Sequence, residues 1–251
     1  MKMIASTRLN RAQRAMNAAK KFGEASEEVF KQSEAQLPRG EGKELFLVVS
    51  SDKGLCGSIH SSLSKRTRKE VNSLKDEGKG DNATVVVLGE KSKGQLGRAI
   101  PLSISLSFNQ VGKDIPTYAD ACVITDTILK EKLEFDRVNI IYNEFVSSIS
   151  FDTTIMPVYG KRALLEAPKF GAYEQEEDVT NDLATFSLTN AIFATLVEGH
   201  ASEINSKRNA MDNASKSAGD MISNLNLLYN RGRQAVITNE LIDIITGASS
   251  L

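Results

Sequence analysis

Residues 211–242 read MDNASKSAGDMISNLNLLYNRGRQAVITNELI, and this stretch decides the fold class. Small and apolar residues recur in it at alternating spacings of three and four. They are Met211, Ala214, Ala218, Met221, Leu225, Leu228, Gly232, Ala235, Asn239 and Ile242. A heptad run of this length favours a left-handed coiled coil. We call these positions the seam. Because the seam contains many alanines and is interrupted by Gly232 and Asn239, we expect it to pack closely while burying little apolar surface.

The seam lies inside a longer helical signal. Proline is absent from residue 178 to Gly247, and acidic residues cluster at 174–178, where they suit the positive end of a helix dipole. Asp178 or Thr180 is the expected N-cap. A continuous helix of ~68 residues would span ~100 Å, whereas a typical globular helix has ~11 residues. Such a helix must find a use outside a compact core.

Residues 1–36 form a second helical signal. They lack proline, are rich in alanine, and repeat Leu9, Ala12, Met16 and Ala19 along one face. Residues 1–21 carry six lysines and arginines and no acid. The segment has too few large apolar residues for a helix that binds a membrane surface. It also has no aromatic residue before Phe22 that could stack on nucleic-acid bases. A solvated face and a helix inside an acidic protein sleeve both remain open.

The region from 43 to 171 alternates strand and helix patterns. We expect strands at 45–49, 83–88, 103–108, 137–145 and 151–159, the last interrupted by Pro157. Helices are expected at 58–74, 90–98 and 117–133, the last opened by Pro116. This alternation predicts a Rossmann-like, mostly parallel sheet, with the last two strands as an antiparallel edge.

The expected fold class is therefore α/β plus long helices. Residues 1–36 and 178–251 would form an antiparallel coiled coil, with the 43–171 domain inserted between them. Two alternatives stay open. The long helix could form a homodimeric coiled coil, or it could fold back on the α/β domain.

Composition excludes several classes of function. The net charge is −1, and no apolar run approaches the ~20 residues of a membrane helix. The overall charge therefore gives no reason to expect a nucleic-acid partner, and no membrane-spanning helix is expected. The two cysteines, Cys56 and Cys122, have no CxxC spacing, so neither a zinc site nor a disulfide framework is expected. With only His60 and His200, a histidine metal site or catalytic triad is not expected. No cofactor is expected.

A glycine-bearing loop, Asp52-Lys-Gly-Leu-Cys-Gly57, follows the first expected strand. Loops between a strand and a helix can cradle phosphate. This loop lacks both the GxxxxGK[ST] and the GxGxxG spacing. We interpret Gly54 and Gly57 as turn and close-packing residues, and Cys56 as a buried structural thiol.

Five segments resemble the gamma subunits of F-type ATP synthases, and their sequences are most similar to those of fungal mitochondrial members. They cover essentially the whole chain in the same order. They are MKMIAS at 1–6, SSDKGLCG at 50–57, RNAMDNAS at 208–215, YNRGRQAVIT at 229–238 and ELIDIITG at 240–247.

The resemblance implies a non-catalytic central-stalk rotor, which couples rotation of the proton-driven ring to conformational change in the catalytic hexamer. The implied partners are the alpha and beta subunits, the small stalk subunits delta and epsilon, and the membrane c-subunit ring. The implied location is the matrix side of the mitochondrial inner membrane, with membrane association only through the complex. The segment 241–251, with Asp243 as its one charged side chain, would suit a helix tip turning in an apolar sleeve.

The resemblance also implies contact residues. Arg233 and Gln234 match residues that hydrogen-bond a beta-subunit loop, and Arg231 is a weaker carry-over. Lys53 and Arg8 match basic positions that face acidic groups of the hexamer. Lys53 stands where mitochondrial relatives often have arginine, which keeps the charge but not bidentate pairing.

Relatives have a further helical stretch before the position of Met1, so the chain is expected to begin inside its first helix, and any transit peptide would lie upstream. Two other function classes remain in view. A nucleotide-binding α/β enzyme would need an acid–base or metal constellation, yet Asp52, Asp120 and Asp126 are scattered. A homodimeric coiled-coil scaffold is the third possibility.

Overall fold

The structure is a computed structural model that describes residues 2–250, apart from 37–41, 112, 132, 134, 175 and 176. The chain divides into two compact units, Met1–Asn209 and Ala210–Leu251. Part of the acidic cluster expected before the long helix, Glu176, lies outside the described residues.

A five-stranded sheet forms the centre of the first unit. Its strands are β1 (Glu44–Val49), β2 (Ala83–Leu88), β3 (Ile104–Phe108), β4 (Arg137–Phe145) and β5 (Phe151–Val158), in the order β3-β2-β1-β4-β5. All neighbours are parallel except β4 and β5. The expected mostly parallel sheet with one antiparallel edge is confirmed. Pro157 does not end β5, because an edge strand tolerates a residue without a backbone N–H.

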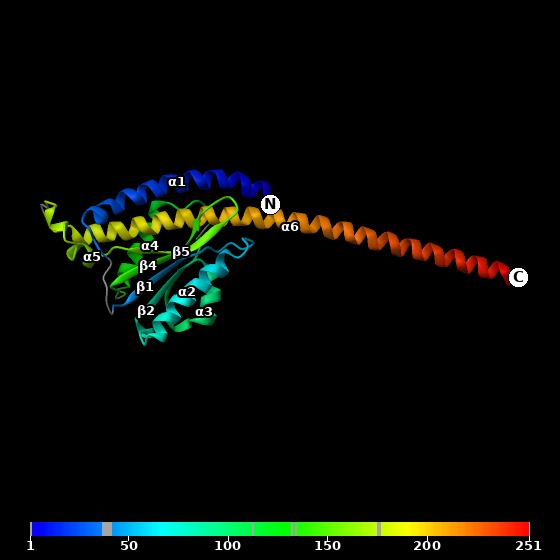
Figure 1. The fold of residues 1–251 in the computed structure, drawn as a ribbon, viewed down its shortest axis with the longest axis horizontal. Helices are drawn as coiled ribbons and strands as arrows, with labels where there is room; N and C mark the ends of the chain where they lie inside the picture. The colour runs from blue at the N-terminus through cyan, green and yellow to red at the C-terminus, as the bar shows by residue number, and fades with distance from the viewer. Residues whose placement is uncertain are drawn as a thin grey trace. The chain divides into compact units, whose positions relative to one another are not determined.

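Helices cover both faces of this sheet (Figure 1). Alternate residues of β1 separate the two cores. Leu45, Leu47 and Val49 pack with α4 (Tyr118–Lys130) and with α6 (Thr180–Ser249), whereas Phe46 and Val48 pack with α2 (Ile59–Asp76) and α3 (Glu90–Ala99). Burial on both faces explains why the central strands are continuous apolar runs rather than alternating patterns.

Shorter elements complete the unit: α5 (Lys161–Leu165) and the 3₁₀ turns η1 (Gly80–Asn82), η2 (Pro101–Ser103) and η3 (Phe170–Ala172). The expectation that Pro116 opens α4 was wrong, because Pro116 lies one residue before the N-cap and not in the first turn. Thr117 is the N-cap, and its side chain and that of Asp120 form a reciprocal capping box. At the start of α6, Asp178 Oδ1 accepts the Thr180 N–H at 3.1 Å, which agrees with the expected cap.

Helix α1 (Lys2–Gln32) lies antiparallel to the first part of α6, within the first unit (Figure 1). Its buried positions are small or apolar and follow heptad spacing: Ala5, Leu9, Ala12, Ala19, Gly23 and Phe30. Met16, expected on this face, is partly buried. At Gly23 a Cβ would stand 3.3 Å from Ala194 Cβ. The small residues therefore allow the two helix backbones to approach closely.

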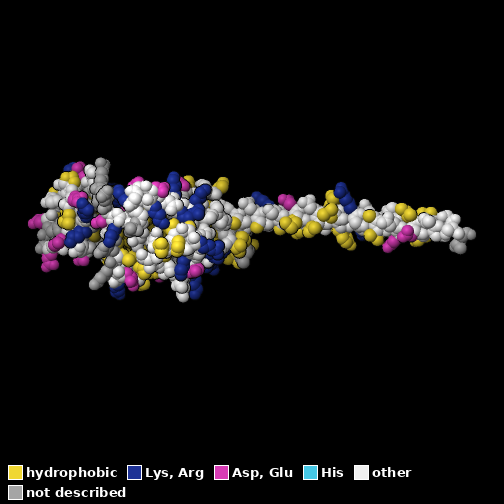
Figure 2. Space-filling view, turned by 90° about the horizontal axis from the view of Figure 1, so that it is seen from below, with side chains coloured by type: hydrophobic (Ala, Val, Ile, Leu, Met, Phe, Trp, Pro, Cys, Tyr) yellow, Lys and Arg dark blue, Asp and Glu magenta, His cyan; other side chains and the backbone are white. Residues whose placement is uncertain are grey.

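The second unit consists of the rest of α6. Its described residues 213–250 are exposed along every face. The seam side chains of Met221, Leu225 and Leu228 leave 63%, 59% and 62% of their surface accessible. Figure 2 shows hydrophobic side chains along this segment. Pairing of the 211–242 seam with another helix stays a prediction.

We expect Gly23→Leu to lower the free energy of unfolding by about 1–3 kcal/mol, because a larger side chain forces α1 away from Ala194. Denaturant titration of the purified chain measures it. The matched control is Gly219→Leu, where a Cβ meets nothing within 4 Å and helix propensity alone raises stability by up to ~1 kcal/mol. Equal effects at both positions would contradict close packing at Gly23.

Candidate functional site

The carboxyl edge of the sheet between β1 and β4 is the place where chemistry is expected in an open α/β fold. From β1 the chain winds through β2 to β3 on one side, and β4 lies on the other, so this point is the topological switch. Ligands of such sheets bind in the crevice that forms there. In this chain Ser50 and Ser51 follow β1, and Asn143 lies on the neighbouring strand β4.

Helix α6 fills this crevice. Leu196, Gly199, His200 and Glu203 line it from above, and the cavity that remains has a volume of about 20 Å³. That volume holds about one water molecule. Small-molecule sites need ~300 Å³ or more. The switch point of this fold therefore anchors a helix and has no room for a nucleotide.

His60 ties the loop after β1 to the sheet. Its Nε2 lies 2.9 Å from the Lys53 carbonyl oxygen, and its Nδ1 lies 3.0 Å from Ser50 Oγ. Because a carbonyl can only accept, Nε2 carries the proton, and Nδ1 accepts from the Ser50 hydroxyl. Burial lowers the pKa of His60, which keeps the imidazole neutral in this role.

His200 and Glu203 lie one turn apart on α6, with 8% and 3% of their surface exposed. Burial is the main cause that lowers the pKa of His200 to about 4. The charges of Lys53 and Arg8 act in the same direction, and that of Asp114 opposes them. Burial raises the pKa of the Glu203 carboxyl. Both shifts favour neutral side chains, as low-dielectric surroundings require.

Cys56 lies against the same cluster, with its Sγ 3.2 Å from the Gly54 carbonyl oxygen and 3.6 Å from Glu203 Oε1. Burial and the Glu203 charge raise the pKa of the thiol to about 12. The thiol is therefore protonated at neutral pH and a poor nucleophile. This geometry agrees with a structural thiol.

The loop 52–57 is held in one conformation. Asp52 Oδ1 accepts the Glu90 N–H at 2.7 Å and so caps α3. A side chain at Gly89 (φ 97°) would meet the Ser51 backbone at 2.5 Å, so only glycine permits this approach. Leu55 adopts φ 63° and exposes 71% of its surface. A left-handed conformation is uncommon for leucine, and here it turns a large apolar side chain toward solvent.

The structure brings together two of the five expected contact residues. Lys53 Nζ donates to the Lys113 carbonyl oxygen at 2.6 Å, and the charges of Lys53 and exposed Arg8 both act on His200. Arg231, Arg233 and Gln234 lie on α6 in the second unit, where all three are exposed. Their contact roles stay predictions.

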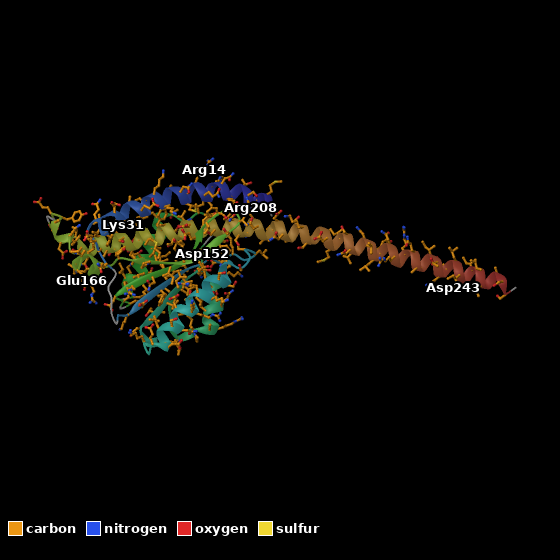
Figure 3. The ribbon with its side chains drawn as sticks, viewed as in Figure 1. Arg14, Lys31, Asp152, Glu166, Arg208 and Asp243 are labelled. Carbon is orange, nitrogen blue, oxygen red and sulfur yellow. The ribbon has the colours of Figure 1, made fainter. Side chains whose placement is uncertain are left out.

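Sequence reasoning missed the polar side chains of α6 that face the sheet edge. Asn205 donates to the Ser147 carbonyl oxygen at 3.0 Å, and Ser206 Oγ donates to the Cys56 carbonyl oxygen. The available signal was the segment Ser202-Glu203-Ile204-Asn205, in which three of four residues are polar. Figure 3 labels Arg208 on this stretch, beside the β4–β5 hairpin.

Among the described residues, no cluster of three or more His, Cys, Asp or Glu side chains is arranged to hold a metal ion. None of the described helices is both long enough and apolar enough to cross a membrane.

Comparison with known proteins decides the family. A family described as ATP synthase matches residues 1–251. The mitochondrial ATP synthase subunit gamma of Yarrowia lipolytica is 53% identical over 251 residues, which cover 100% of this chain and 85% of that protein. The chain belongs to the ATP synthase gamma-subunit family.

A further relative agrees with this assignment, and two solved structures share the fold. The gamma subunit of the Rattus norvegicus F(1) complex is 40% identical over 252 residues, with 100% of this chain and 92% of that protein covered. A central-stalk chain of the Tetrahymena thermophila mitochondrial ATP synthase superposes with a TM-score of 0.70 at 22% identity, over 86% of this chain and 97% of the other. A Euglena gracilis ATP synthase chain gives 0.72 at 16% identity, over 99% and 94%. These structures show that the fold is shared.

We expect acid to destabilise this gamma-family chain through His200. Its pKa is about 4 in the folded chain against an ordinary 6.5, so protonation favours the unfolded state. The contribution is complete above pH 6.5 and is lost as pH falls toward 4, up to about 3 kcal/mol. His60 acts in the same direction, and the raised pKa of Glu203 acts in the opposite one.

Unfolding free energies measured between pH 7.5 and 4.5 test this expectation. His200→Gln keeps a neutral polar side chain and should flatten the decline below pH 6.5, without removing the part due to His60. An unchanged slope in this variant would mean that His200 titrates normally in the folded chain.

Proposed function

We propose that this chain is the central-stalk rotor of a mitochondrial ATP synthase. In this role it couples rotation of the proton-driven c-subunit ring to conformational change in a hexamer of alpha and beta subunits. Delta and epsilon are the proposed small stalk partners. The proposed place is the matrix side of the inner membrane, which the chain contacts only through the complex. The chain would not be a catalyst itself, since ATP chemistry would belong to the hexamer.

The observation that carries this proposal is the exposed apolar helix of the second unit. Large side chains leave about half or more of their surface accessible over several turns, for example Leu225 at 59%, Leu241 at 53% and Ile245 at 66%. Monomeric proteins rarely expose contiguous apolar surface of this extent. A surrounding partner would bury it, and the names of the gamma-family relatives indicate which complex supplies that partner.

Cations on this helix would supply angle-dependent contacts. Arg231 and Arg233 are exposed and lie two residues apart, with Gln234 adjacent. Charged and amide side chains that pair at one rotor angle and separate at another differ in energy between states, and such a difference is what coupling requires. We propose Arg233 and Gln234 as the main contacts with beta, Arg231 as a weaker one, and Lys53 and Arg8 as contacts near the sheet edge.

The two competing functions have weaker support. A nucleotide-binding enzyme would use the switch point. There the side chains of α6 leave a cavity of only about 20 Å³. A homodimeric coiled-coil scaffold would also bury the exposed seam. It gives no reason for relatives across this whole length to be named as ATP synthase subunits.

Native mass spectrometry of the tagged chain, purified gently from its own source with ATP present, tests the rotor proposal. We expect one copy held with three alpha and three beta subunits. A free monomer or a homodimer under these conditions would contradict the proposal, and a homodimer would favour the scaffold.

We expect Arg233→Ala with Gln234→Ala to lower ATP-driven turnover of the assembled complex roughly threefold to tenfold. The lost hydrogen bonds are worth about 1 kcal/mol in the state that makes them. Assembly should be normal. The control is Lys216→Ala, which removes another exposed cation of the same helix, one that lies 3.3 Å from Asp212. Turnover equal to that of the control would contradict the proposal that Arg233 and Gln234 contact the beta subunit.

A further inference from the structure

Two asparagines of α6 bind the tip of the β4–β5 hairpin. Asn205 Nδ2 donates to the Ser147 carbonyl oxygen and Asn209 Nδ2 donates to the Ser148 carbonyl oxygen, each at 3.0 Å. The two asparagines are four residues apart, so they lie on one face of the helix. Asn205 is 2% exposed. We call these two side chains and their two carbonyl acceptors the hairpin clamp.

Other polar contacts extend the hairpin clamp along the same stretch of α6. Glu198 Oε1 accepts the Phe145 N–H at 3.2 Å, two turns before Asn205. Between the asparagines, Ser206 Oγ donates to the Cys56 carbonyl oxygen, so the loop after β1 is bound to the helix as well. Every one of these bonds ends on backbone of the α/β domain, whose position is set by the sheet.

The hairpin tip offers fixed acceptors rather than a mobile loop. Ser147 Oγ lies 2.8 Å from Ser150 Oγ and accepts the N–H groups of Ile149 and Ser150 at 3.2 and 3.1 Å. The Ser147 N–H donates to the Ser150 carbonyl oxygen at 3.1 Å. Behind the tip, β4 and β5 stay paired from Phe145↔Phe151 to Val138↔Val158.

The character of the α6 interface changes along the helix. Earlier in α6, Leu188, Ala191, Ile192 and Leu196 belong to the large core beneath the sheet face. Apolar contact is non-directional, so it holds a helix against a sheet while resisting rotation about the helix axis only weakly. Hydrogen bonds weaken steeply with distance and angle. The clamp lies beyond Leu196, the last buried α6 residue of that core, and it extends to the last residue of the first unit, Asn209.

We propose that the hairpin clamp fixes the rotational angle of α6 relative to the α/β domain, with Asn205 and Asn209 as its positioning residues. The proposal rests on the rotor function proposed above. In a rotor, torque between the α/β domain and α6 passes through the contacts that join them in the first unit. The clamp is the last set of directional contacts among the described residues of the first unit.

The geometry sets a narrow angular range. Side-chain atoms lie ~5 Å from a helix axis, so a rotation of ~10° displaces them by ~1 Å, which is enough to break a 3.0 Å hydrogen bond. The two bonds therefore help to hold α6 within roughly this range. Their loss leaves the apolar contact and the bonds of Glu198 and Ser206 to restore the angle.

A single-molecule rotation assay on the assembled complex tests the clamp. The hexamer is immobilised, a bead is attached to the α/β domain, and angular fluctuations are recorded during ATP-waiting pauses. For Asn205→Ala with Asn209→Ala we expect the angular variance to rise roughly twofold, because the two bonds that join α6 to the hairpin tip are lost. Unloaded ATP turnover should stay close to the parent value. Loss of the buried Asn205 bond lowers the melting temperature, so the variance is recorded well below it.

The matched control is Asn181→Ala with Asn226→Ala. These are two exposed asparagines of the same helix for which the structure shows no side-chain hydrogen bond. Angular variance equal to that of the control, in a complex that assembles and rotates, would overturn the clamp and leave the rotor function standing. A parent chain that assembles with the hexamer but does not rotate would overturn the rotor function and the clamp with it.

Asn209→Asp provides a second variant in case the double substitution fails to fold. Asn209 is only half-buried, and aspartate keeps its shape while replacing the N–H donor by an acceptor that faces the Ser148 carbonyl oxygen. Increased angular variance in this variant supports the clamp. Unchanged variance, with Asn209→Ser behaving identically, overturns it.

Discussion

Burial of α6 between the sheet and α1 is the constraint on which the first unit depends. Residues 187–192 of the helix are all buried, and so are 200–205, because the helix has partners on opposite sides. On the sheet side, Leu188, Ile192 and Leu196 join the core of β1 and β4. On the other side, α1 approaches closely enough that Gly23 stands against Ala194. The sheet therefore buries one side of α6, and α1 approaches the other.

That arrangement changes what the carboxyl edge of the sheet does. In most open α/β sheets this edge leaves a crevice for a ligand. Here α6 fills the crevice with His200 and Glu203, whose burial shifts both pKa values toward the neutral form. The loop after β1, a phosphate-binding element in other folds, is fixed by His60 and Asp52 instead. At the switch point between β1 and β4, a helix is therefore attached where other sheets of this kind bind a ligand.

The two units differ in how they obtain stability. The first has two hydrophobic cores, one on each face of its sheet. The second is helix alone, with its described residues exposed from 213 onward. An isolated helix gains little from propensity, and most helical stability in proteins comes from packing of an apolar face. Its apolar residues therefore point to burial by a partner, and in the proposed rotor that partner is the hexamer.

The sequence alone determined the strands, their mostly parallel arrangement and the long C-terminal helix, because buried strands are continuous apolar runs and no proline interrupts residues 178–247. It also indicated the small-residue face of α1 through Leu9, Ala12 and Ala19. It did not decide which part of the long helix that face meets. Heptad spacing identifies an apolar face but not what covers it, so the expected partner was the 211–242 seam, and Ala194 was not among the expected residues. Tertiary structure decided the matter. The sheet fixes the start of α6, and the antiparallel approach at Gly23 then places α1 along residues 180–209, where polar side chains such as Asn205 find backbone partners from strands distant in sequence.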